Sequence, residues 1–124
     1  MNETQLNQSV VRELKRLGRW AYKTSDRFNA GVPDVYCTGG IWFEGKVATC
    51  KTHVNIVSKI SPEQYIFAKM LEHFGDRWYL AVAIKFDGVI KYGAFRYEQI
   101  PVPLKENLCK PKLSACLEDI LRVE

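Results

Sequence analysis

Apolar residues recur at steps of three and four along the first part of the chain. The residues with this spacing are Leu6, Val10, Leu14 and Leu17. The period predicts an amphipathic helix over residues 3–17, and Gly18 suits its end. Residues 20–25 are then typical of a strand, and the polar, glycine-containing residues 26–31 are typical of a loop.

Two further strands are predicted on either side of a short glycine-containing turn. Residues 32–37 and 41–47 have strand character, and Thr-Gly-Gly at 38–40 suits a hairpin loop between them. Residues 48–60 have no firm pattern and suit a loop or an extra edge strand. We expect an inserted loop with the bounds 47–60.

A second helix is predicted over residues 61–75 by the signals at its two ends. Ser61 suits the N-cap, Pro62 the first turn, Gln64 the partner in a capping box and Gly75 the end. The expected apolar stripe of this helix is Phe67, Ala68, Leu71 and Phe74.

The rest of the chain predicts two strands and one more helix. Residues 78–86 and 89–95 are strand-like and are joined by Asp87-Gly88, a strong hairpin signal. A proline-punctuated segment leads to a final helix near 113–122. The order αβββαββα predicts one α/β domain with a mixed sheet over residues 1–124, with residues 98–124 as a C-terminal extension.

Composition narrows the class of protein. A chain of 124 residues with 47% hydrophobic and 26% charged residues is that of one soluble domain. No apolar run approaches the ~20 residues of a membrane span, and the polar N-terminus does not resemble a signal peptide. We therefore expect a cytoplasmic protein.

Cysteine, histidine and charge content exclude some kinds of site. The four cysteines form no CxxC pair and there are only two histidines, which favours free thiols over structural zinc or a disulfide scaffold. His53 is not favoured as a metal ligand. The net charge of +4 fits a nucleic-acid partner without establishing one.

The first predicted hairpin brings chemically useful side chains together. Residues two apart in a strand share a face, so Glu44 and Lys46 project together. If residues 38–40 form the loop, Cys37 pairs with Ile41, and counting back pairs Asp34 with Glu44. Directly opposed residues have Cβ atoms ~4.5–5.5 Å apart, and two opposed carboxylates repel each other. A cation, a shared proton or full solvation would offset that repulsion.

Metal-assisted phosphodiester hydrolysis is the chemistry that this group suits. Mg²⁺ takes oxygen ligands, commonly one or two carboxylates with waters and substrate phosphates, and the Gly45 carbonyl could add another oxygen. Lys46 would then stand beside a metal-bound water. On spacing alone, a solvated polar face of an exposed hairpin explains the same residues.

The motifs around the hairpin resemble the PD-(D/E)xK nuclease superfamily, and its VRR-Nuc branch in particular. Pro33-Asp34 matches the PD, and Glu44-Gly45-Lys46 matches the ExK. The surrounding matches are Glu3 with Leu6, Val10, Leu14 and Gly18 in the first helix, Gly31-Val32 before the PD, and Ser61-Pro62-Glu63-Gln64 opening the second helix. The resemblance covers about residues 3–85.

The resemblance implies a restriction-endonuclease-like αβββαβ core, in which a central mixed sheet is flanked by helices, and a role for each matched residue. Asp34 and Glu44 would bind Mg²⁺ or Mn²⁺ with the Gly45 carbonyl, and Lys46 would orient or activate the attacking water. Glu3 would approach the metal or its water shell, with Glu13 as a rival. Gln64 would support the site, although capping of Ser61 explains it too.

The resemblance further implies a DNA endonuclease, with branched DNA such as Holliday junctions or flaps as a candidate substrate, a phage-like origin and a homodimer. The candidate phosphate contacts are Lys23, Arg27, Lys51 and Lys59. Three alternatives stay open: a site-specific nuclease of the restriction type, a catalytically silent nucleic-acid-binding module, and a host-protein-binding module on the same fold.

Overall fold

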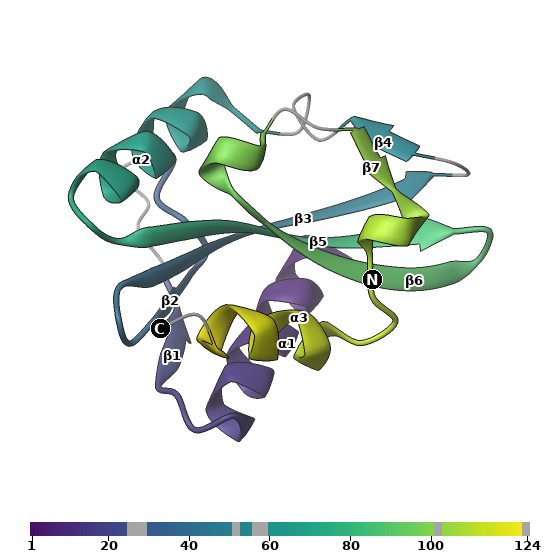
Figure 1. Cartoon of the computed structure of the whole chain (residues 1–124), viewed down its shortest axis with the longest axis horizontal. Coiled ribbons are helices and arrows are strands. Elements are labelled where there is room, and N and C mark those ends of the chain that lie inside the picture. Colours follow the sequence, from purple (N-terminus) through teal and green to yellow (C-terminus); the bar gives the residue numbers. More distant parts are fainter. Residues whose placement is uncertain (25–29, 51–52, 56–59, 101–102, 123–124) are drawn as a thin grey trace.

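Helices cover both faces of a five-stranded sheet in the computed structural model of the chain (Figure 1). The structure describes all residues except 25–29, 51–52, 56–59, 101–102 and 123–124. The helices are α1 (Glu3–Arg16), α2 (Pro62–His73) and α3 (Leu113–Arg122), with short 3-10 helices η2 (Tyr97–Gln99) and η3 (Glu106–Leu108). The strands are β1 (Ala21–Lys23), β2 (Val35–Cys37), β3 (Ile41–Cys50), β4 (His53–Asn55), β5 (Arg77–Phe86), β6 (Val89–Arg96) and β7 (Pro103–Lys105).

The large sheet is mixed, as the sequence predicts. Its order is β1-β2-β3-β5-β6, in which β3 and β5 are parallel and the other neighbours are antiparallel. A parallel pair needs a crossover between its strands, and α2 lies in that connection. The short strands β4 and β7 pair with each other in a separate sheet, on the same side of the large sheet as α2 in Figure 1.

An apolar layer lies on each face of the sheet. On one face α1 and α3 pack their stripes against alternate residues of the strands; this layer includes Leu6, Val10, Leu14, Val35, Phe43 and Leu117. On the other face Ala68 of α2 packs with a second set that includes Trp78, Leu80, Val82 and Ile84. Since α3 contributes to the first layer, residues 113–122 are part of the core of the domain.

The ends of the two long helices follow their sequence signals. α1 has Asn2 as its N-cap, and Gly18 beyond its end has φ +91. α2 has Ser61 as its N-cap, and the predicted capping box with Gln64 is confirmed. Both signals act within one helical turn, which is why local sequence suffices to find them.

The apolar stripe predicted on α2 is only partly buried. Ala68 is buried and Leu71 packs against the second layer, whereas Phe74 is 78% exposed. Phe74 is the C-cap, so it lies where the helix ends and the chain turns away from the sheet. Helical periodicity does not extend to a residue in that position.

Residues 47–50 differ from the inserted loop that we expected to begin there. They continue β3, which pairs with β5 along its whole length from Ile41–Arg77 to Cys50–Phe86. The hydrogen bonds that hold this segment come from a strand that lies far along the chain, and nothing in the local pattern shows them.

Within the described residues no helix is long and apolar enough to cross a membrane.

Candidate active site

The hairpin between β2 and β3 has the register that the sequence predicts. Cys37 pairs with Ile41 and Val35 with Phe43, so the next opposed pair is Asp34 and Glu44. The Gly45 N–H donates a hydrogen bond to Asp34 Oδ2 at 3.0 Å. The N–H and C=O of one strand residue point to the same side, so the Gly45 carbonyl also faces the Asp34 side of β3.

Asp34 and Glu44 lie at the point where the pairing between β2 and β3 ends. β2 pairs with β3 only up to Val35–Phe43, whereas β3 continues for seven more residues to Cys50. In the described part of the chain, no strand pairs with that edge of β3 beyond Phe43. Backbone groups and side chains from other elements can therefore approach the segment that carries Glu44, Gly45 and Lys46.

Glu44 is buried although it carries an ionisable group. It is 1% exposed, and in register with Leu80 its side chain lies on the α2 face of the sheet. Burial, a hydrogen bond with Asp34 and the charge of Asp34 raise the pKa of Glu44 to about 10; Lys46 acts against this rise and Glu3 adds to it. Without a cation, Glu44 therefore keeps its proton near neutral pH and donates it in the hydrogen bond to Asp34.

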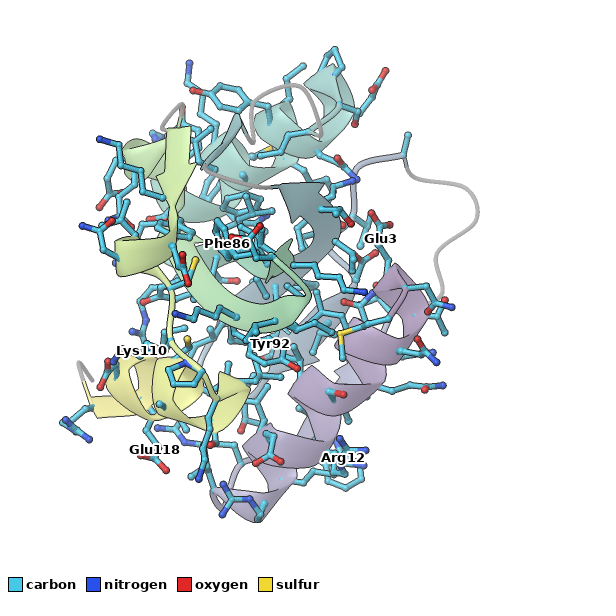
Figure 2. The ribbon with its side chains drawn as sticks, turned by 90° about the vertical axis from the view of Figure 1, so that its right-hand side faces the viewer. Glu3, Arg12, Phe86, Tyr92, Lys110 and Glu118 are labelled. Atoms are coloured by element: carbon cyan, nitrogen blue, oxygen red, sulfur yellow. The ribbon has the colours of Figure 1, made fainter. Side chains whose placement is uncertain are left out.

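Glu3 acts on this centre from α1. Figure 2 shows Glu3 at the N-terminal end of α1, beside the strands of the large sheet. Its carboxylate is among the charges that raise the pKa of Glu44. Glu13 lies ~15 Å further along the helix axis and its carboxylate is paired with Arg16 at 2.7 Å. Of the two rivals, Glu3 is the one whose charge acts on Glu44, and its role at the site stays a prediction.

Gln64 is held by the cap of α2. Its Oε1 accepts a hydrogen bond from the Ser61 N–H at 2.9 Å, and its own N–H donates to Ser61 Oγ at 3.1 Å. The backbone of the first turn of α2 also lies against the loop before Asp34: a Cβ on Gly31 would overlap the Glu63 carbonyl and lie 2.9 Å from Gln64 N, and Gly31 has φ +89. The Gln64 side chain therefore stabilises the turn that borders this loop. Direct action on a substrate stays a prediction.

Of the four candidate phosphate contacts, one lies within the described residues. Lys23 is exposed at the end of β1, but it pairs with Val35 and so extends from the α1 face, opposite to Asp34 and Glu44. Arg27, Lys51 and Lys59 lie outside the described residues. Lys46 is half-buried. It is the described basic residue of β3 nearest to the two carboxylates, and its side chain lies on the same face of the sheet, two residues from Glu44.

Three aromatic side chains continue this face away from the carboxylates. Tyr22, Tyr36 and Trp42 pair across β1, β2 and β3. Their ring centroids are 5.6 Å and 4.8 Å apart, and Tyr22 at the edge is exposed. Tyr36 is two residues from Asp34, and Trp42 is two residues from Glu44, so each ring lies on the same side of its strand as a carboxylate.

Asn7 is a residue of this region that sequence reasoning missed. It is 9% exposed, and with Glu44 it makes up the buried polar side chains found in the described residues. A Cβ on Gly45 would overlap the Asn7 carboxamide and would lie 3.0 Å from its Cγ. The available signal was a polar residue four positions after Glu3, next to the apolar stripe of a helix.

The oxygen atoms present suit a hydrated divalent cation. No group of three Asp, Glu, His or Cys side chains converges as a ready-made site within the described residues. Asp34 and Glu44 supply two carboxylates, the Gly45 carbonyl faces them, and buried Glu44 Oε1 has no hydrogen-bond partner among the described atoms. Two carboxylates with waters and substrate oxygens are a common arrangement for Mg²⁺.

Comparison with known proteins adds to this geometry. No protein-family profile matches the chain, and no curated protein matches its sequence. Among solved structures the chain is similar to Hjc, a Holliday junction resolvase from the archaeal hyperthermophile Archaeoglobus fulgidus, with a TM-score of 0.52 over 85% of this chain and 89% of that chain. The chain has the fold of that resolvase. At 16% identity the likeness concerns the fold alone.

This likeness confirms the fold class expected from the sequence. The chain has the five-stranded mixed sheet with flanking helices that the sequence predicts, and it shares this fold with Hjc. A shared fold does not carry function, which has to be argued from the site.

Proposed function

We propose that this protein is a Mg²⁺- or Mn²⁺-dependent DNA endonuclease of the VRR-Nuc branch that is selective for branched DNA. The observation that carries the proposal is the buried carboxyl group of Glu44, which lies beside Asp34 with one oxygen unpartnered among the described atoms, at an open strand edge next to Lys46. A structural carboxyl group gains nothing from such a place, because burial without a partner costs free energy. A cation-binding carboxylate has a reason to be there.

Each residue has a stated task in the proposed hydrolysis. Asp34, Glu44 and the Gly45 carbonyl would hold the cation, which would supply positive charge for the phosphate and for the attacking water. Lys46 would orient or activate that water and face the charge that develops on the phosphate. Glu3 would approach the cation or its water shell, and Gln64 would support the site from the first turn of α2.

Branched DNA is the substrate that we favour. The similar structure is that of a Holliday junction resolvase, and the aromatic series Tyr22, Tyr36 and Trp42 lies on the face of the site. Aromatic rings stack well on bases that are not held in a continuous duplex, as at a junction or flap. A homodimer and a phage origin belong to the same proposal.

Cleavage assays test the proposal directly. The protein is incubated with a plasmid, a linear duplex, a flap and a four-way junction, each with Mg²⁺, Mn²⁺ or EDTA. We expect cutting of the branched substrates with either metal and none with EDTA. Asp34→Asn and Lys46→Ala should each abolish cutting, while Lys85→Ala, at an exposed lysine of β5, should not.

The outcomes separate the alternatives. Equal cutting by the parent, Asp34→Asn and Lys46→Ala would show that the active site lies elsewhere. Tight junction binding without cutting in any metal would favour the silent DNA-binding module. Cutting of one duplex sequence alone would favour a nuclease of the restriction type.

A further inference from the structure

The aromatic series of Tyr22, Tyr36 and Trp42 ends at the free edge of the large sheet. β1 is the outermost strand, and no described strand pairs with its outer side. Tyr22 is 48% exposed on this strand, and Trp20, just before it, is 62% exposed. Large exposed rings on an edge strand invite association with other molecules, and natural edges usually avoid them. A group of such rings is typical of a binding surface.

The inner end of the series is fixed and its outer end is open. Trp42 Nε1 donates a hydrogen bond to Asp76 Oδ2 at 2.9 Å, and the Trp42 ring packs against the second apolar layer. The Tyr36 ring lies between those of Trp42 and Tyr22 and is tilted by 64° and 50° to them. The inner rings thus hold Tyr22 in place, while half of its side chain stays open to a ligand.

The charge along the same edge is positive. Lys15 and Lys23 are both exposed. Lys15 Nζ lies 4.7 Å from the centroid of the Trp20 ring, and Lys23 is the next residue after Tyr22 in β1. Aromatic rings stack on bases of any sequence, and lysines contact phosphates. Rings with ammonium groups beside them therefore suit a nucleic-acid strand better than an uncharged apolar partner.

The distance from the series to the two carboxylates limits which nucleotides can reach it. Tyr36 is two residues from Asp34, and Trp42 is two residues from Glu44, on the same face. Two strand residues span ~6.6 Å, which is about two base steps of ~3.4 Å each. A base inside a duplex is covered by its neighbours, whereas an unpaired base can stack on a protein ring.

We propose that Tyr22, supported by Tyr36, stacks on the unpaired bases next to the cleaved bond, and that Lys15 and Lys23 contact phosphates of the same strand. This inference deepens the proposed function and rests on it. It assigns the discrimination of branched from fully paired DNA to residues that take no part in hydrolysis. Removal of the Tyr22 ring should therefore abolish the preference for branched DNA and leave binding of duplex DNA unchanged.

The test is binding in EDTA, measured by fluorescence anisotropy with two probes: a linear duplex, and the same duplex with a single-stranded thymidine flap. Stacking of one base is worth ~1–3 kcal/mol, or roughly 5- to 150-fold in affinity. Tyr22→Val keeps the strand propensity and removes the ring, so it should weaken flap binding by about that factor and duplex binding by less than about twofold. Tyr22→Phe should bind both probes as the parent does. Phe74→Val is the matched control, because this exposed ring lies at the C-cap of α2, outside the aromatic series.

Two further readouts report on the bases and on the phosphates. The fluorescence of a 2-aminopurine in the flap, next to the branch, should be quenched by the parent and by Tyr22→Phe but not by Tyr22→Val. Lys15→Ala and Lys23→Ala should each lower the dependence of log Kd on log salt concentration for the flap probe, by about 0.7 per phosphate contact.

The contrary results point to different errors. Unchanged flap affinity in Tyr22→Val, or equal weakening for flap and duplex, overturns the stacking role of Tyr22 and leaves the nuclease proposal standing. Unchanged salt dependence in both lysine variants overturns their contact with phosphates. A parent that prefers the flap, loses this preference in Tyr22→Val and yet cuts no DNA with any metal supports the stacking surface and overturns the nuclease.

Discussion

The pH dependence of folding offers a test of the centre that needs neither DNA nor metal. Glu44 is 1% exposed and has a pKa of about 10, because it is buried and lies beside Asp34; its ordinary value is 4.5. Between these two pH values the folded chain holds one proton more than the unfolded chain. The free energy of unfolding must then fall as pH rises, by up to ~1.4 kcal/mol for each pH unit.

The size of the effect at neutral pH follows from the same shift. pH 7 lies about 2.5 units above the pKa of an unfolded glutamate. The protonated Glu44 therefore lowers the free energy of unfolding at pH 7 by on the order of 3 kcal/mol relative to acid pH. The Glu44→Gln variant has no proton to lose at this position. We therefore expect Glu44→Gln to be more stable than the parent at pH 7 by roughly this amount, and the two to converge near pH 4.5.

Urea denaturation followed by tryptophan fluorescence measures the difference. The parent and Glu44→Gln are compared in EDTA between pH 5 and 8, with Glu63→Gln as the control at an exposed glutamate of α2. The difference between the parent and Glu44→Gln should widen with pH, while Glu63→Gln should follow the parent. A parent whose stability stays level or rises over this range, or a parallel decline in Glu44→Gln, would refute the assignment of a protonated Glu44.

Three further predictions concern individual contacts. Gly45→Ala should destabilise the fold by ~1–3 kcal/mol through its collision with Asn7, and urea denaturation should show a smaller loss in an Asn7→Ala background; equal losses would rule out the contact. Glu72→Ala should cost ~1–3 kcal/mol, because its carboxylate binds Arg96 at 2.8 Å and caps a β5 N–H; a loss below the error of chemical denaturation would show that the pair is immaterial. Phe74→Ser should change the free energy of unfolding by less than ~0.5 kcal/mol, since this ring is exposed, and a loss of several kcal/mol would show that it is buried in solution.

The parts of the fold that the sequence predicted are those decided by neighbours in the chain. The capping box of α2 and the hairpin register that opposes Asp34 to Glu44 each depend on residues within one turn or one short loop. The exposure of Phe74 and the length of β3 depend instead on where the chain goes next and on β5. Local periodicity carries no information about either.

The same division explains why the site could be predicted only in part. Strand alternation places Glu44 and Lys46 on one face, but it also fits a solvated polar surface. What favours a functional centre is the burial of Glu44, the charge of Glu3 that acts on it from α1, and an edge of β3 that β2 leaves unpaired beyond Phe43. That edge exists because β2 has three residues and β3 has ten. The extra length of β3 comes from pairing with β5, so a contact outside the site creates the opening in which the site is built.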